Sequence, residues 1–249
     1  MLQVSENSEL RRDLGATLYL LSNFYSVMHE TVQARVRGTD GDPNVKGTHA
    51  HNLEKARNAV LSKLLLLITD MKTNAAFSKF QLRVGGRFPR EEYERYLRSG
   101  REEDGRLLTK LCTSLIECCS RLTQSIALIG YASRTFSLHT SSPDRPELSQ
   151  WSTDFRKLLV SINPTSHRYT SLLALLSSSL ANGAPLPPYL EMPPPFEMIK
   201  KIETIDPDLL SIRHIAEPEY SAFAVVQISA QTVNADILEL TKYAFMTPV

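Results

Sequence analysis

Cysteine is scarce in this chain of 249 residues, and its placement excludes a disulfide scaffold. The three cysteines, Cys112, Cys118 and Cys119, fall within one stretch of helical spacing, whereas structural disulfides join segments that are distant in the sequence. Cysteine is also among the residue types most often found buried. We therefore expect these side chains to pack in a core, in a protein that folds in a reducing compartment.

Long apolar runs and an excess of charge are also missing. The longest uninterrupted aliphatic run, residues 64–68, is far shorter than the ~20 residues that span a bilayer, and the first residues, MLQVSENSELRRD, lack the apolar core of a signal peptide. The formal net charge is +1, whereas a dedicated nucleic-acid-binding protein is strongly basic. The sequence thus predicts a chain that is soluble by itself and binds no nucleic acid.

No motif of catalysis or cofactor binding occurs. The chain has no Gly-x-Ser-x-Gly elbow, no phosphate-binding glycine loop and no His-Glu-x-x-His. Ser166-His167 and Arg213-His214 contain groups capable of acid–base chemistry, but a serine at the start of a helix is ordinarily a cap. The second pair precedes an acidic loop, which favours an ion-paired connector. An enzyme that uses His167 or His214 is an alternative hypothesis, and the leading interpretation assigns no catalytic residue.

Metal-binding patterns are weak as well. His49 and His51 flank Ala50, with His29 as a candidate neighbour. No cysteine or clustered carboxylate accompanies them at the spacings that structural metals prefer. We therefore predict no metal site and no cofactor.

Helical periodicity occupies most of the chain, and no alternating strand pattern or internal repeat accompanies it. The sequence predicts helices over residues 10–36, 49–83, 89–129, 149–162, 165–180 and 196–205 and from 218 onward, with loops at 38–48 and 136–148. Gly100 or Gly105 can interrupt the third helix. The predicted fold is an all-α bundle of about six helices that forms a single domain over residues 1–249, with frayed ends at 1–9 and 244–249.

A proline-rich stretch precedes the last two helices and reads SSSLANGAPLPPYLEMPPPF over residues 177–196. Asn182 and Gly183 are residue types that end a helix in a left-handed turn, and the prolines that follow fix φ and remove backbone donors. A flexible linker would be richer in glycine and serine than in proline. We interpret residues 182–196 as a stiff connector, a strap that crosses the bundle surface and holds the last helices against the others.

Two blocks of the sequence resemble a known family. LLALLSSSLANGAPLPPYL (172–190) and DPDLLSIRHIAEPEYSAFAVVQ (206–227) resemble the C-terminal domain of unknown function in fungal multi-spanning membrane proteins of the brefeldin A sensitivity type. Those proteins are similar to fusaric acid resistance proteins and aromatic acid exporters. Agreement extends to TLYLLSNFYSVMHETVQARV (17–36), FPREEYERYL (88–97) and PTSHRYTSLL (164–173), so the resemblance covers nearly the whole chain.

We assign the positions that carry the resemblance as structural signature residues, because no catalytic residues are established for this domain in the family. They are Asn182, Gly183, Pro185, Pro187, Pro188 and Tyr189 in the first block and Ile212, Arg213, His214, Glu217, Pro218 and Tyr220 in the second.

The resemblance implies a non-catalytic helical domain on the cytosolic side of a membrane, which serves assembly or regulation in the transport of small organic anions. Its expected partners are transmembrane helices of the same or a partner polypeptide, with a homo-oligomer as a further option and only peripheral membrane contact by this chain. Family members carry membrane-spanning segments upstream, so a fragment, a truncated gene product and a free-standing domain all fit. The alternative function is a free-standing helical adaptor for protein–protein interaction.

Overall fold

The computed structural model describes residues 2–81, 101–138, 149–162, 167–182, 186 and 197–246. These residues form seven α-helices and three short 3₁₀ turns, with no strand among them. The helices are α1 (Leu2–Arg37), α2 (His49–Gln81), α4 (Arg101–Ala132), α5 (Gln150–Ile162), α6 (His167–Asn182), α7 (Glu197–Ile205) and α8 (Pro218–Met246), and the turns are η1 (Ser133–Phe136), η2 (Pro207–Leu210) and η3 (Ile212–His214). The predicted all-α, multi-helix fold is confirmed.

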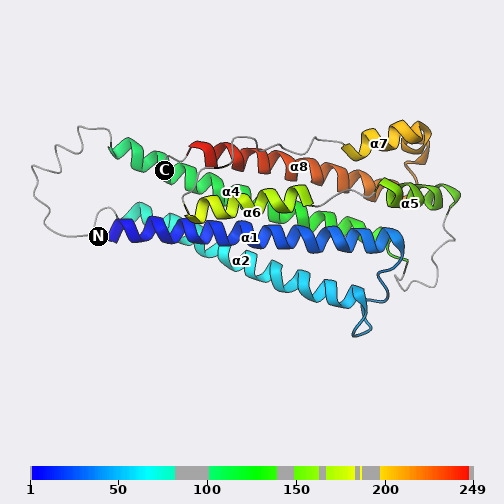
Figure 1. Cartoon of the computed structure of the whole chain (residues 1–249), viewed down its shortest axis with the longest axis horizontal. Coiled ribbons are helices and arrows are strands. Elements are labelled where there is room, and N and C mark those ends of the chain that lie inside the picture. The colour runs from blue at the N-terminus through cyan, green and yellow to red at the C-terminus, as the bar shows by residue number, and fades with distance from the viewer. Residues whose placement is uncertain are drawn as a thin grey trace, which may run out of the picture.

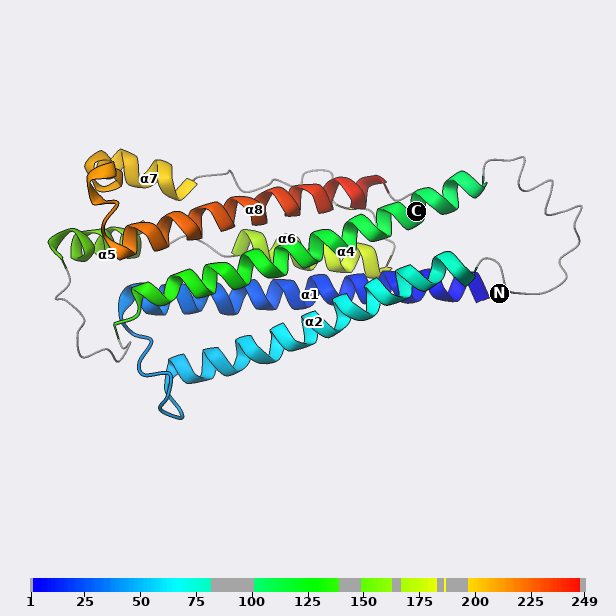
Figure 2. The same cartoon turned by 180° about the vertical axis from the view of Figure 1, so that it is seen from behind.

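Five helices run along the long axis of the molecule, and two short ones lie at one end. In Figures 1 and 2, α1, α2, α4, α6 and α8 lie lengthwise, whereas α5, α7 and the turns η2 and η3 gather where α8 begins. α1 and α6 are antiparallel, because Ser22 Oγ donates to Thr170 O (2.9 Å) and Ser177 Oγ donates to Gly15 O (2.7 Å). α8 runs antiparallel to α4 along most of its length (Figure 2).

Local capping sets the boundaries of the first two helices. Gly38 has φ +70°, a left-handed conformation that ends α1, and the N–H of Thr39 bonds back to Ala34 O (2.9 Å). α2 begins after Thr48, whose Oγ1 accepts a hydrogen bond from His51 N (3.2 Å). The loop predicted at residues 38–48 is thus present as expected.

Two clusters of buried apolar side chains hold these helices together. The larger lies among the five long helices, and its members recur at helical spacing along the sequence; they include Leu14, Leu18, Leu21, Met28, Leu64, Met71, Leu115, Cys118, Leu122, Ile129, Leu172, Leu173, Leu176, Leu180, Val233, Ile237 and Leu240. The smaller joins the helices at one end through Phe136, Phe155, Leu159, Ile202, Leu209, Ala222 and Phe223. The apolar periodicity of the sequence therefore identified most of the core.

Some predicted boundaries shift in the structure. α1 begins at Leu2, so residues 2–9, expected as a frayed end, continue the helix, and α8 extends to Met246. Gly105 lies within α4, which continues through it. Gly100, the helix start predicted near Pro89 and most of the strap lie outside the described residues. Within the strap, Leu186 is described, and it is buried in the larger cluster.

Candidate functional site

The second signature block packs around Trp151 of α5. His214 stacks on the Trp151 ring, with 5.3 Å between ring centroids and an interplanar angle of 18°. Phe155 stacks on the same indole (4.8 Å), and Tyr220 lies tilted against it (6.1 Å). Trp151 Nε1 donates to Leu209 O (3.1 Å). One aromatic side chain therefore holds the connector between α7 and α8 against α5.

Hydrogen bonds from neighbouring signature residues reinforce this contact. Tyr220 Oη donates to Leu210 O (3.1 Å), and Ser149 Oγ donates to Glu217 Oε2 (3.1 Å). The Ser149 hydroxyl also caps α5, because it accepts a hydrogen bond from Ser152 N (3.1 Å). These contacts join Tyr220 and Glu217 of the second block to their neighbours on η2 and at the start of α5.

A buried ion pair joins α5 to the first turn of α8. Arg156 Nη2 lies 3.2 Å from Glu219 Oε1, and the two side chains are 8% and 6% exposed. Arg156 Nη1 also donates to Phe136 O (2.7 Å), the last residue of η1. Because Pro218 is the first residue of α8, the pair fixes the point at which the connector enters that helix.

Ile212 and Arg213, two further signature residues of this block, face outward, and so does the neighbouring Ile215. Ile212 is 76% exposed and Ile215 is 59% exposed, and Arg213 between them is exposed too. Ile205, at the end of α7, is 59% exposed. We call Ile205, Ile212 and Ile215 the isoleucine surface. It lies on backbone that the Trp151 contacts and the Arg156–Glu219 pair hold in place.

The first signature block is described at one position. Asn182 is the exposed last residue of α6, and its Nδ2 donates to Ser178 Oγ (3.2 Å). α6 runs away from α5 and α7 toward the other half of the molecule (Figure 1), so its last residue does not join the Trp151 group. Gly183, Pro185, Pro187, Pro188 and Tyr189 lie outside the described residues.

The histidines considered for metal binding or catalysis have separate surroundings. His49 Nε2 lies 3.5 Å from Glu30 Oε1, His51 Nδ1 lies 3.1 Å from Pro43 O, and His29 Nε2 lies 3.5 Å from Gln33 Nε2. His167, at the start of α6, is exposed, whereas His214 stacks on Trp151. The contacts described for these side chains do not assemble a nucleophile, a base and an orienting group.

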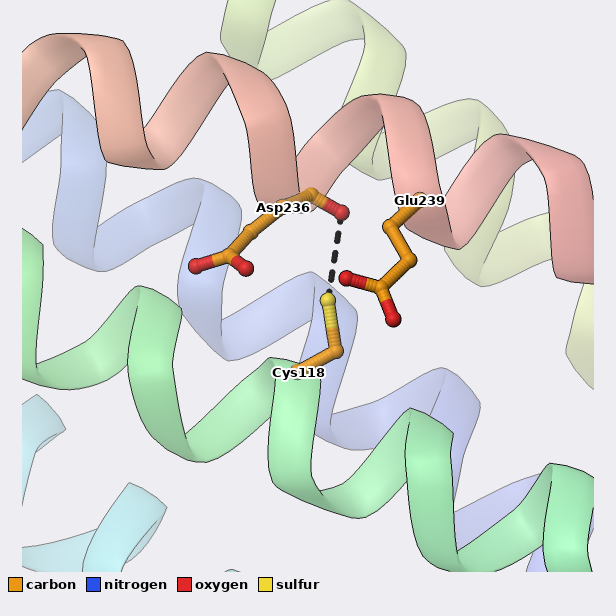
Figure 3. Close-up of side chains that lie close together, drawn as sticks. All are labelled: Cys118, Asp236 and Glu239. Atoms are coloured by element: carbon orange, nitrogen blue, oxygen red, sulfur yellow. Dashed lines mark hydrogen bonds between the residues drawn. The ribbon is translucent and has the colours of Figure 1, made fainter.

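Sequence reasoning missed a polar cluster between α4 and α8, shown in Figure 3. Ligand atoms of Cys118, Asp236 and Glu239 lie within 4.8 Å of one another. Arg121 contacts both carboxylates, since its Nη2 lies 2.7 Å from Asp236 Oδ1 and 2.7 Å from Glu239 Oε2, and its Nε donates to Asp236 Oδ1 (2.8 Å). The spacing of Asp236 and Glu239 on one helix face was a signal, but their cation comes from another helix.

The chemistry of this cluster is that of an internal ion pair. The Arg121 guanidinium already supplies the positive charge between the two carboxylates, where a metal ion would otherwise lie. Cys118 Sγ donates to Asp236 O (3.1 Å), the dashed line of Figure 3, and burial raises the pKa of the Cys118 thiol well above its ordinary range. A protonated thiol is a poor metal ligand and a poor nucleophile. The cluster therefore fits a structural role.

The buried thiols of Cys118 and Cys119 make the stability of the folded protein fall at alkaline pH. Burial, together with the Asp236 charge, raises the pKa of Cys119 from 9.0 to about 12, and burial raises the pKa of Cys118 in the same direction. In the unfolded chain both thiols ionise near pH 9. The stability that they contribute is therefore fully present below pH 9 and is lost as pH rises toward 12.

We expect the Cys118→Ala/Cys119→Ala variant to lose less stability than the wild type as pH rises from 9 to 11. Each thiol contributes up to about 1.4 kcal/mol per pH unit to the wild-type slope. Urea unfolding at pH 8, 9, 10 and 11 measures the difference. Parallel curves for the two proteins would show that the thiols ionise as easily in the folded state as in the unfolded one.

Two apolar pockets flank Phe223 of α8. One, of about 60 Å³, is lined mainly by Val32, Val36, Leu159, Met198 and Val226, with Gln33 and Arg37 at its polar side. The other, of about 210 Å³, is lined by residues of α7, η2 and α8, among them Ile199, Leu210 and Ile228. Neither lining combines convergent polar groups with the titratable residues of a catalytic site.

Among the described helices, none combines the length and the apolar content that crossing a membrane requires. In comparisons with known proteins, no family model, no curated protein and no solved structure matches this chain.

Proposed function

We propose that this chain is a non-catalytic helical docking domain of a fungal exporter-like membrane protein, which contacts transmembrane helices and serves assembly or regulation in the transport of small organic anions. The two sequence blocks that resemble the brefeldin A sensitivity type support the family assignment. The isoleucine surface, which falls in and beside the second block, supports the docking role.

The isoleucine surface is the observation that carries this proposal. Ile205, Ile212 and Ile215 are all more than half exposed within eleven consecutive residues. Scattered exposed apolar residues are ordinary, but Ile212 and Ile215 lie on a connector that is held in place, and Ile205 ends the helix that precedes it. Covering a fully exposed isoleucine contributes roughly 1.5–3 kcal/mol, so a partner that buries all three gains substantial binding energy.

The charges around this surface are mixed. Glu203 and Asp208 are exposed and Asp206 is half-buried, while Lys200, Lys201 and Arg213 are exposed in the same segment. Anionic headgroups attract clusters of basic side chains, and interleaved acidic side chains weaken that attraction. The preference for an apolar helix face of a membrane protein therefore rests on the three isoleucines and not on charge.

The second candidate is a free-standing adaptor that uses the same surface to bind a soluble protein. The isoleucine surface supports a protein partner in either case, so the fraction in which the chain is found separates the two. An adaptor purifies with a soluble protein and is absent from the membrane fraction.

We expect the Ile212→Asp/Ile215→Asp variant to lose its membrane partner. A carboxylate at these positions places a charge in the proposed apolar contact, which is costly when left unpaired. The chain, expressed with a tag in fungal cells, is separated into membrane and soluble fractions, and the variant's share in the membrane fraction falls at least several-fold.

The matched control for that experiment is Leu65→Asp/Leu66→Asp on α2, where the two leucines are 54% and 65% exposed. This pair is equally apolar and lies away from the connector, so its membrane share stays at the wild-type value. Equal loss in both variants would assign the effect to general destabilisation, and no loss in the isoleucine variant would remove the docking surface.

A further inference from the structure

The outward face of α8 carries apolar and small side chains where a surface helix ordinarily carries charge. We call this face the α8 seam, and its positions are Ser221, Val225, Ile228, Thr232, Ala235, Leu238 and Lys242. Ile228 is 64% exposed, Leu238 is 42% exposed and Val225 is 36% exposed. The seam has no charged residue before Lys242. Depletion of charge at such a face is typical of the centre of a protein interface.

The exposed apolar pair of α2 differs from the seam in this respect. Leu65 and Leu66 of α2 are also exposed, but Lys63, Asp70 and Lys72 are exposed beside them on the same helix. A face of mixed charge is solvated without cost. The α8 seam is instead apolar or small over five helical turns, and the hydroxyl of Thr232 is already satisfied because it donates to Ile228 O (3.1 Å).

The seam has the spacing of a helix-pairing face. Its positions follow one another in steps of four and three residues, the pattern that keeps one side of a helix against a partner helix. When the α8 helices of two copies pair antiparallel, Ile228 of one lies opposite Ala235 of the other, and Val225 lies opposite Leu238. Large side chains thus face small or medium ones. Such a surface is self-complementary, which is the condition for a two-fold interface.

We propose that the α8 seam binds the seam of a second copy of this chain, with the two α8 helices antiparallel around a two-fold axis beside Thr232. This inference does not depend on the proposed function, because it concerns a different face of the molecule and a different partner.

Charge at the ends of the seam favours the antiparallel arrangement. In this pairing Lys242 lies opposite the first turn of the other α8, next to Glu217 of the partner subunit. The negative end of each helix dipole also lies beside the positive end of the other. A parallel pairing would bring Lys242 against the partner's Lys242 and align the two dipoles unfavourably.

The size of the seam sets the strength of the dimer. From position 221 to position 242 it is roughly 32 Å long. With a width of about 10 Å it covers roughly 300 Å² on each copy, about half of the ~1,200 Å² total at which stable interfaces begin. The dimer is therefore weak and reversible, and it forms only at high protein concentration.

Sedimentation velocity between about 10 μM and 1 mM tests the inference with matched variants. The wild type shifts from monomer toward dimer across this range, Ile228→Lys stays monomeric throughout, and Leu66→Lys, an equally exposed residue on α2, dimerises as the wild type does. Circular dichroism checks that each variant is folded. A wild type that is monomeric at 1 mM, or an Ile228→Lys protein that still dimerises, would overturn the proposal.

Spin labels test the arrangement of the two copies, in labelled proteins that sedimentation velocity shows to dimerise as the wild type does. They are placed by Thr232→Cys or Lys242→Cys in a Cys112→Ser background, where Cys118 and Cys119 are buried. In the antiparallel dimer, backbone positions 232 of the two copies lie roughly 10 Å apart and positions 242 roughly 30 Å apart. Short distances at both positions indicate a parallel pair, and no distance below about 60 Å at either position indicates another interface. Either result would contradict the proposal.

Discussion

Replacing Glu219 with alanine lowers the free energy of unfolding by about 3–5 kcal/mol, a large share of the 5–15 kcal/mol that a domain ordinarily has. Arg156 is 8% exposed and pairs with Glu219 Oε1 at 3.2 Å, so the substitution leaves a guanidinium charge buried with its bond to Phe136 O. Desolvation of a charge without its counter-ion is the physical source of the loss. Urea unfolding at pH 7 measures it.

The double variant Arg156→Leu/Glu219→Leu separates this mechanism from simple loss of contacts. When both charges are removed, no buried charge is left unpaired, and apolar side chains of similar size often replace such a pair at little cost. We therefore expect the double variant to be more stable than Glu219→Ala. A double variant that is less stable than either single one, or a Glu219→Ala protein that loses under 1 kcal/mol, would contradict the assigned role.

Gly15→Leu forces α1 and α6 apart and lowers the free energy of unfolding by about 3 kcal/mol. A Cβ at position 15 would lie 2.9 Å from Ala181 Cβ and 3.1 Å from the backbone oxygen of Ser177. Neither neighbour is the end of a flexible side chain, so the helices themselves must move apart. The same movement weakens the hydrogen bond from Ser177 Oγ to Gly15 O (2.7 Å).

Ala16→Leu is the matched control, because Ala16 is the next residue of the same helix and is exposed. Leucine is a good helix former, so this control changes stability by less than 0.5 kcal/mol. Thermal unfolding of both variants compares them directly. Equal melting temperatures would mean that the α1–α6 contact tolerates a large side chain and is not close-packed.

The helical core was predictable because a helix that packs on one side repeats its apolar residues every three or four positions. Leu14, Leu18, Leu21 and Met28 follow that rule in α1, and all four are buried. The same periodicity gave the ends of α5 and α7 to within one residue. Local sequence carries this information, so no distant contact was needed to read it.

The polar contacts were not predictable, because each joins residues from separate helices. Arg156 lies between the inward-facing Phe155 and Leu159 in the sequence. Its position on α5 could not identify Glu219, on another helix, as its ion-pair partner. Asp236 likewise depends on Arg121 of α4. The sequence block around His214 suggested an ion-paired connector, whereas in the structure this histidine stacks on Trp151.

The α8 seam shows a further limit of periodicity. The spacing of apolar residues in α8 places Phe223, Val233 and Ile237 inward, and all three are buried. The same helix also carries Val225, Ile228 and Leu238 outside that inward face. The exposed fractions of Ile228 and Leu238, 64% and 42%, show that these side chains stay accessible after the helices have packed. Which face of α8 stays exposed among the described helices is thus a property of the assembled bundle.

Membrane fractionation of the native gene product tests the proposed docking role most directly. The account predicts that the wild-type product is found in the membrane fraction, that Ile212→Asp/Ile215→Asp weakens its crosslinking to membrane proteins several-fold, and that Leu65→Asp/Leu66→Asp does not. A product found in the soluble fraction together with a soluble partner would contradict the membrane assignment and favour the adaptor.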